Sequence, residues 1–283
     1  MQPGSTSFIQ RLRAVFRVWS NIRRLPLVRG NIGTSRVSFA FLRGGRAMTL
    51  WVIYRLTTEL TSSILRWLNV TIMHFAPANR GILPPMTRRD LYLRAVFSVR
   101  WIWSTYAVLT GTHDLLAIFF VCLLRWDQPD EWPALFGSLA EAYSLRRFWG
   151  AFWHRLHVAP FEAYFPLSFL RCDETHQPQR FAGRGPTGKA LRALWMFLLS
   201  AGCHATINWV TMGNANATQE FRFFLSNYAV CFAETVAKQT VWGKLGSEGG
   251  ILVRLCGYVW VIAVFFCLVP AWQYSLVCIA AGY

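Results

Sequence analysis

The segment Ala193–Met212 constrains the fold more than any other part of this sequence. It contains no charged residue and, as a helix, is long enough to cross a lipid bilayer. His204 lies inside this segment. Because an ionisable side chain at membrane depth is energetically costly, His204 is a candidate functional residue.

The composition extends this expectation to the whole chain. The 283 residues are 54% hydrophobic and 15% charged, with a mean hydropathy of +0.31, which is more apolar than a soluble domain of this length. We therefore predict an all-α, polytopic membrane bundle with a catalytic chamber and about 5–8 spans. The clearest expected spans are 101–124, 191–212, 221–242 and 251–269.

Two apolar regions of the chain cannot be assigned as simple membrane spans from the sequence. Residues 47–75 are apolar but carry Arg55, Glu59 and Arg66, so they form either a tilted span or an interfacial helix. The final apolar run continues to Tyr283, and we expect Pro270 to break it in two because proline disrupts a helix interior.

We predict two divisions of the chain: a basic N-terminal region, 1–46, and a single membrane domain, 47–283, with a polar motif loop at about 125–189. The first 58 residues contain no acidic side chain. Within them, an amphipathic pattern typical of an interfacial helix on an anionic leaflet places four apolar residues on one face. These residues are Phe8, Leu12, Phe16 and Trp19. A mitochondrial transit peptide has a similar composition, and this alternative stays open.

The net charge of +16 would suggest a nucleic-acid partner in a soluble protein. Here the basic residues alternate with apolar segments, which favours contact with a lipid bilayer and an anionic ligand, and we expect no nucleic acid. The segment 171–192 is rich in Arg and Lys, 213–219 has neither, and 243–250 carries Lys244. By the positive-inside rule these loops are cytosolic, lumenal and cytosolic. The seven cysteines form no CxxC pair, so no disulfide framework or zinc site is expected.

A polar stripe accompanies His204. Ser200, His204 and Asn208 recur every four residues and share one helical face, which must contact another helix or a wet cavity. The stripe therefore either hydrogen-bonds across the bundle or lines a chamber. His113 and Asp114, in an earlier apolar segment, form either a polar contact or a helix break after Gly111.

The segment after this one has a matching stripe, which comprises Asn227, Cys231, Glu234 and Lys238. Glu234 and Lys238 are spaced to pair within the helix, as a structural ion pair. The alternative is that Glu234 forms a wall of the chamber that His204 lines.

Basic and aromatic residues alternate in Ser144–His154, which reads SLRRFWGAFWH and is followed by Arg155. Arginine is suited to bidentate phosphate recognition, and tryptophan to stacking on an adenine or lining an apolar tunnel. The same pattern is typical of an interfacial membrane segment, with Arg at the headgroups and Trp at the boundary.

The order of these motifs carries a resemblance to a known family. Trp132-Pro133, Phe136-Gly137, SLRRFWGAFWH and LLSAGCH, in that order, resemble the wax-synthase-like branch of the membrane-bound O-acyltransferase superfamily. The similarity is greatest to fungal members associated with terpenoid and meroterpenoid O-acetylation, and it extends over roughly residues 85–270. Residues 1–75 match no recognised motif.

The resemblance implies a multi-span enzyme of the endoplasmic reticulum that moves an acyl group from acyl-CoA to a lipophilic alcohol, without a metal. It implies that His204 is the general base and that His154, where many relatives have Asn, polarises the carbonyl or orients the donor. Acetyl-CoA is the expected donor. The residues expected to bind it are Arg146, Arg147, Trp149, Trp153 and Arg155, and those expected to line the chamber are Ser200, Asn208 and Glu234. A long-chain wax ester synthase, a transporter and a non-catalytic scaffold remain as alternatives.

Overall fold

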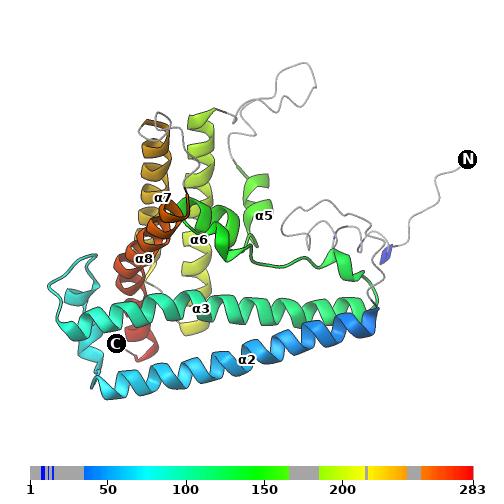
Figure 1. Ribbon diagram of the computed structural model, residues 1–283, viewed down its shortest axis with the longest axis horizontal. Coiled ribbons are helices and arrows are strands. Elements are labelled where there is room, and N and C mark those ends of the chain that lie inside the picture. The colour runs from blue at the N-terminus through cyan, green and yellow to red at the C-terminus, as the bar shows by residue number, and fades with distance from the viewer. Residues whose placement is uncertain are drawn as a thin grey trace, which may run out of the picture. The chain divides into compact units, whose positions relative to one another are not determined.

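The computed structural model describes residues 35–165, 185–213, 216–240 and 250–282, together with residues 8, 9, 12 and 15. In these residues the chain is helical and contains no strand, which confirms the all-α prediction (Figure 1). The predicted N-terminal amphipathic helix lies mostly outside the described residues. Its described residues, Phe8, Ile9, Leu12 and Val15, are helical and exposed.

The longer helices are α2 (Arg36–Trp67), α3 (Arg88–Ile118), α6 (Pro186–Met212), α7 (Ala217–Thr240) and α8 (Ile251–Ala280). Shorter helical turns connect them: η1 (Ile72–Phe75), η2 (Pro77–Arg80), η3 (Phe119–Leu123), η4 (Pro129–Glu131), η5 (Leu139–Glu141), α4 (Leu145–Arg147), η6 (Phe148–Phe152) and α5 (Val158–Ala163). Of these turns, η3 and η6 are π-helical.

Among the described helices, three are long and apolar enough to cross a membrane. They are α3 with its extension to Leu123, α6 and α8. The predicted span at 221–242 corresponds to α7, which is not one of the three because it carries several charged residues. The protein is thus an integral membrane protein, and the larger number of spans stays a prediction.

The chain divides into two compact units. The first comprises residues up to Thr58, Trp103–Phe136 and His154–Ala159, and the second comprises Glu59–Ile102, Gly137–Trp153 and the residues from Pro160 onward. The predicted boundary between 46 and 47 falls inside α2, and the single domain from residue 47 stays a prediction.

In the first unit, α2 packs antiparallel against the second half of α3. The Cys122 thiol donates to the carbonyl of Arg36 at one end, and the Trp103 indole N–H donates to the Thr57 hydroxyl (2.9 Å) at the other. Between them, Arg43 and Arg46 of α2 reach Asp114 of α3. The order along α2 is the reverse of the order along α3, as an antiparallel pair requires.

Asp114 is fully buried between these two arginines. Arg43 Nη1 donates to its Oδ1 at 2.7 Å, and Arg46 Nε donates to its Oδ2 at 2.6 Å. The neighbouring His113 packs its ring against Trp132, with centroids 5.1 Å apart. Of the two alternatives for His113 and Asp114, the polar contact is confirmed and the helix break after Gly111 is wrong, because α3 continues through Gly111.

The second unit centres on aromatic packing between α3, α7, α8 and the turn η6. Trp101 of α3 has five aromatic neighbours, at centroid distances from 5.0 to 6.2 Å. These neighbours are Trp149, Trp153, Phe223, Phe265 and Trp272. Each large ring removes a large apolar area from its surroundings, so this cluster fixes η6 against the helices.

The predicted break at Pro270 is also wrong, because α8 runs through it from Ile251 to Ala280. Proline lacks an N–H and leaves the carbonyl four residues earlier without its helical donor. That carbonyl belongs to Phe266, and Arg94 of α3 donates to it (3.5 Å) and to the carbonyl of Cys267 (3.4 Å). The buried Arg94 guanidinium thus supplies donors where Pro270 removes one, and the helix continues.

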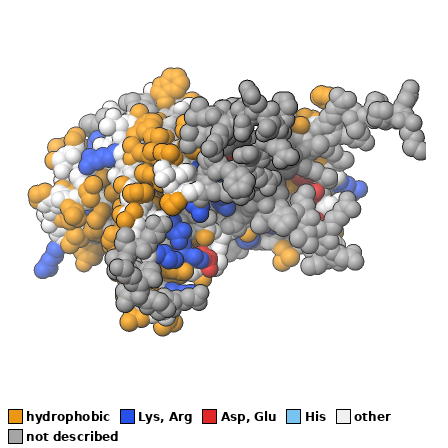
Figure 2. Space-filling view, turned by 90° about the horizontal axis from the view of Figure 1, so that it is seen from above, with side chains coloured by type: hydrophobic (Ala, Val, Ile, Leu, Met, Phe, Trp, Pro, Cys, Tyr) orange, Lys and Arg blue, Asp and Glu red, His pale blue; other side chains and the backbone are white. Residues whose placement is uncertain are grey.

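Large hydrophobic side chains are exposed along the candidate spans. On α8 they gather in its first half, with Ile251, Leu252, Val259 and Ile262 among the most exposed. Figure 2 shows such side chains covering much of one face, with Lys and Arg close to them. In water this exposure would be unfavourable, whereas lipid chains would cover it.

Candidate active site

His204 faces other helices of the second unit. Its ring packs against Phe224 of α7, with centroids 4.9 Å apart, and against Trp272 of α8 at 6.0 Å. Ala201, three residues earlier on α6, is fully buried, and Ser200 is partly buried. The predicted polar stripe therefore lies on the inner side of α6.

Asn208, one turn after His204, connects α6 to α7. Its amide donates to Glu220 Oε1 at 2.6 Å, and the Glu220 side chain is almost completely buried. Glu220 was not among the site residues predicted from the sequence. A signal for it exists, since Glu220, Asn227 and Cys231 are spaced i, i+7 and i+11 and so share one face of α7.

The Trp272 indole N–H interacts with the same carboxylate. The two groups are farther apart than in a normal hydrogen bond, because neither Glu220 Oε2 nor Trp272 Nε1 has a partner within that distance among the described residues. Glu220 thus lies between Asn208 of α6 and Trp272 of α8, two side chains that adjoin His204. The hydrogen bond to this buried carboxylate orients the Asn208 amide.

Glu234 holds the motif segment from α7. Its carboxylate accepts hydrogen bonds from the backbone N–H groups of Leu145 (2.8 Å) and Arg146 (2.9 Å), at the start of α4. A negative charge is stabilising there because the first N–H groups of a helix have no helical acceptor. It also accepts from the Trp260 indole (2.7 Å). The predicted ion pair with Lys238 is wrong within the described residues, where Glu234 has these three donors instead.

A second contact from α7 fixes the motif tryptophan. The Trp149 indole N–H donates to Asn227 Oδ1 at 3.1 Å, and Asn227 is fully buried. The Asn227 amide donates in turn to the carbonyl of Phe223 (2.8 Å). Trp153 is buried too, and it stacks on Phe148 at 5.1 Å. The motif segment is therefore bound to α7 at both Glu234 and Asn227.

The motif arginines have different surroundings. Arg146 has an exposed side chain, whereas Arg147 forms an ion pair with Glu141 and lies 4.7 Å over the Tyr143 ring. Arg155 is partly buried and belongs to the first unit. Of the two motif arginines in the second unit, Arg146 is thus the one with an exposed side chain.

His154 belongs to the first unit, whereas His204 belongs to the second. Its ring packs edge-on against Phe136, with centroids 5.6 Å apart, and near His157 at 6.4 Å. Burial lowers the pKa of His157 below its usual value. The predicted partnership of His154 with His204 stays a prediction.

The motif loop approaches α8 closely at Gly257. A Cβ at this position would overlap the carbonyl oxygen of Tyr143, which is backbone and cannot rotate away.

We expect Gly257→Ala to cost about 1–3 kcal/mol of stability through overpacking, and to detach the loop from α8. Thermal unfolding in detergent measures this. Gly111→Ala is the matched control, because nothing lies near its Cβ position and alanine is the better helix former. Equal melting temperatures for both variants would contradict the predicted clash.

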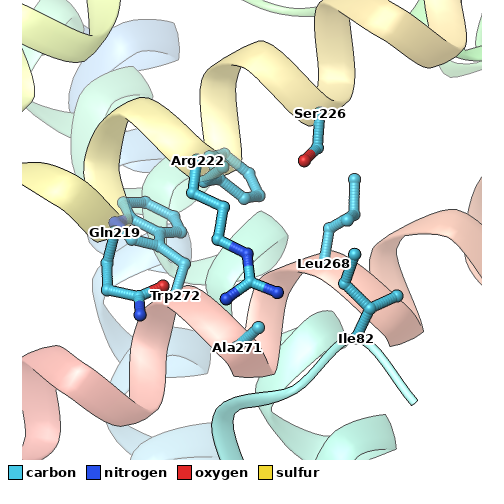
Figure 3. Close-up of a pocket in the computed structure, with 8 residues that line it drawn as sticks. Ile82, Gln219, Arg222, Ser226, Leu268, Ala271 and Trp272 are labelled. Atoms are coloured by element: carbon cyan, nitrogen blue, oxygen red, sulfur yellow. The ribbon is translucent and has the colours of Figure 1, made fainter.

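An open pocket of about 210 Å³ lies between α7 and α8. Figure 3 shows Arg222, Gln219 and Ser226 on its α7 side, with Leu268, Ala271 and Trp272 of α8 and Ile82 completing the view. His204 does not line this pocket. Trp272 is the described side chain that both lines it and contacts the His204 ring.

Within the described ranges, no group of three His, Cys, Asp or Glu side chains is arranged to hold a metal ion. The expectation of catalysis without a metal stays a prediction.

Residues 132–226, which include the motif segment and His204, match the family model described as membrane bound O-acyl transferase family. The predicted resemblance is confirmed. The chain is similar to three fungal acetyltransferases: nanB of Aspergillus nanangensis (28% identity over 61% of this chain and 41% of the relative), atnC of Arthrinium sp (24%, 92% and 61%) and TRI7 of Fusarium sporotrichioides (27%, 62% and 40%). It thus spans about half the length of these relatives. No solved structure matches it.

Proposed function

We propose that this protein is an acyl-CoA-dependent O-acyltransferase that moves an acetyl group to the hydroxyl of a lipophilic alcohol, such as a terpenoid. The observation that supports this most is His204. It is an ionisable side chain on the inner face of an apolar helix, inside the segment that matches the O-acyltransferase family.

In the proposed reaction, neutral His204 accepts the proton of the alcohol as its oxygen attacks the thioester carbonyl of acyl-CoA. The carbon–oxygen bond of the ester forms, the carbon–sulfur bond breaks, and CoA leaves as the thiolate, which takes up a proton. A positioned general base of this kind contributes about 10²–10⁴-fold. His154 polarises the carbonyl, and Ser200 and Asn208 line the alcohol's side of the chamber.

The donor is proposed to approach from the cytosolic side of the endoplasmic reticulum membrane, where Arg146 and Arg155 meet the CoA phosphates. The alcohol, being apolar, enters from the bilayer. The names of the related acetyltransferases favour acetyl-CoA as the donor. We also propose that residues 47–283 act as one catalytic domain, with residues 1–46 on the membrane surface.

Arg146 and Arg147 are expected to differ in role: Arg146 binds the acyl donor, and Arg147 stabilises the fold. We expect Arg146→Ala to raise the KM for acyl-CoA by about tenfold, the effect of losing one charge-assisted hydrogen bond of about 1.5 kcal/mol, with an unchanged KM for the alcohol. Arg147→Ala should instead reduce the amount of folded protein, because Arg147 is engaged with Glu141 and Tyr143. Steady-state kinetics at matched protein levels measure the first, and size-exclusion chromatography the second. Unchanged donor KM in Arg146→Ala would contradict this role.

Acyl-CoA consumption by microsomes that contain the protein tests the proposed function. Acetyl-CoA and palmitoyl-CoA are offered separately with a pool of terpenoid and fatty alcohols, and CoA release and ester formation are recorded. We expect acetyl ester formation above that of empty microsomes, and no labelled acyl group on the denatured protein. Preference for palmitoyl-CoA would favour the wax ester synthase. No transfer from either donor would contradict the proposal.

A further inference from the structure

Trp272 occupies the space beside His204. Its indole is almost fully buried, and its ring lies edge-on to the His204 ring at 6.0 Å. Phe223 stacks on it in parallel, with centroids 4.3 Å apart and an angle of 18° between the planes. Trp101 packs against it edge-on at 5.7 Å. The largest side chain in proteins thus fills the volume next to the candidate base.

The orientation of this indole is fixed. Its N–H lies beyond hydrogen-bond distance of the buried Glu220 carboxylate, to which the Asn208 amide donates at 2.6 Å, so ring packing sets the position of the indole. The Phe223 ring covers one face of the indole. Rotating Trp272 out of this position would forfeit the stacking on Phe223 and the edge contact with Trp101.

The pocket of about 210 Å³ adjoins the same indole (Figure 3). Besides Trp272 its lining combines the apolar side chains of Ile82, Phe223, Leu268 and Ala271 with the polar side chains of Gln219, Arg222 and Ser226. The pocket is open to its surroundings, and Trp272 is the described side chain that both lines it and contacts the His204 ring.

We propose that Trp272, held in place by its ring contacts with Phe223 and Trp101, restricts the acyl donor to short chains by filling the volume beside His204. This inference rests on the proposed function and names its donor class. A hydrophobic wall discriminates by about 10–200-fold per methylene group when no space is free to receive it. The acetyl group needs no space beyond the carbonyl carbon and one methyl.

The test compares acyl-CoA donors of two, four, six and sixteen carbons with the wild-type protein, Trp272→Ala and Trp272→Phe, using one alcohol. The wild type is expected to prefer acetyl-CoA. In Trp272→Ala, the ratio of kcat/KM for butyryl- or hexanoyl-CoA to that for acetyl-CoA should rise by about tenfold or more. Palmitoyl-CoA should stay excluded because the pocket is small. Trp272→Phe keeps an aromatic core and should show an intermediate rise.

Two further variants make the test specific. Phe223→Ala keeps the indole but removes the ring that stacks on it, so it should raise the same ratio by a smaller factor. Trp209→Ala removes an exposed tryptophan from α6 and should leave the ratio unchanged. An unchanged ratio in folded Trp272→Ala and Trp272→Phe would overturn the inference, as would a wild-type preference for longer donors, and both leave the O-acyltransferase proposal in place. Absence of transfer by the wild type with every donor would overturn that proposal and the inference with it.

Discussion

Replacing Asp114 with alanine is expected to destabilise the protein by about 3–5 kcal/mol, the cost of removing one partner from a buried ion pair. Asp114 is fully buried, and Arg43 and Arg46 both bind its carboxylate. Without it, two guanidinium groups lose their counter-ion at the contact between α2 and α3. Arg43, which is the less exposed of the two, would bear most of this cost.

The measurement is the free energy of unfolding in mixed micelles with increasing denaturing detergent. Asp130→Ala is the control, because Asp130 is exposed and such substitutions stay within about 0.5 kcal/mol of the wild type. Asp114→Asn retains the shape and one carbonyl acceptor, so it should lie between the two. If Asp114→Ala is as stable as Asp130→Ala, the ion pair does not hold α2 against α3.

The sequence was sufficient to predict the helices around the candidate base. The charge-free segment around His204 predicted α6, and the four-residue spacing of His204 and Asn208 predicted a shared inner face, which the contacts with Phe224, Trp272 and Glu220 confirm. Such periodicity depends only on helix geometry. It identifies a face without needing to know what packs against it.

Partners across the bundle could not be predicted in the same way. Glu234 was expected to pair with Lys238 because spacing along one helix is visible in a sequence. Its actual donors include the N–H groups of Leu145 and Arg146, roughly ninety positions away, which only the packing of α4 on α7 brings close. Glu220 was overlooked for the same reason, since its partner Asn208 lies on another helix.

The helix break expected at Pro270, and the break that was one of two alternatives at His113 and Asp114, do not occur for a related reason. Pro270 disrupts a helix in isolation, but Arg94 of α3 donates to the carbonyls near it. Asp114 would disfavour an apolar span, but α2 supplies Arg43 and Arg46 as its counter-ions. In both cases a local rule was overridden by a contact between segments far apart in the sequence, as tertiary contacts often override local preference.

Replacing His204 with alanine is expected to lower kcat by about 10²–10⁴-fold, the contribution typical of a general base. The loss should fall on kcat, because in the proposed mechanism His204 receives a proton only during transfer. The free energy of unfolding should change about as much as it does when other partly buried side chains are replaced with alanine. The His204 ring packs against Phe224 and Trp272 but does not fill the centre of the aromatic cluster. His157→Ala is the matched histidine control, because His157 lies in the first unit, outside the candidate spans.

The most direct test is the rate of acetyl ester formation by purified wild-type protein and His204→Ala, with labelled acetyl-CoA and one lipophilic alcohol, at equal amounts of folded protein. The proposed mechanism predicts transfer by the wild type and by His157→Ala, and a rate lower by at least about 100-fold in His204→Ala. Equal rates in wild type and His204→Ala would contradict it and leave His204 as a packing residue between α6, α7 and α8.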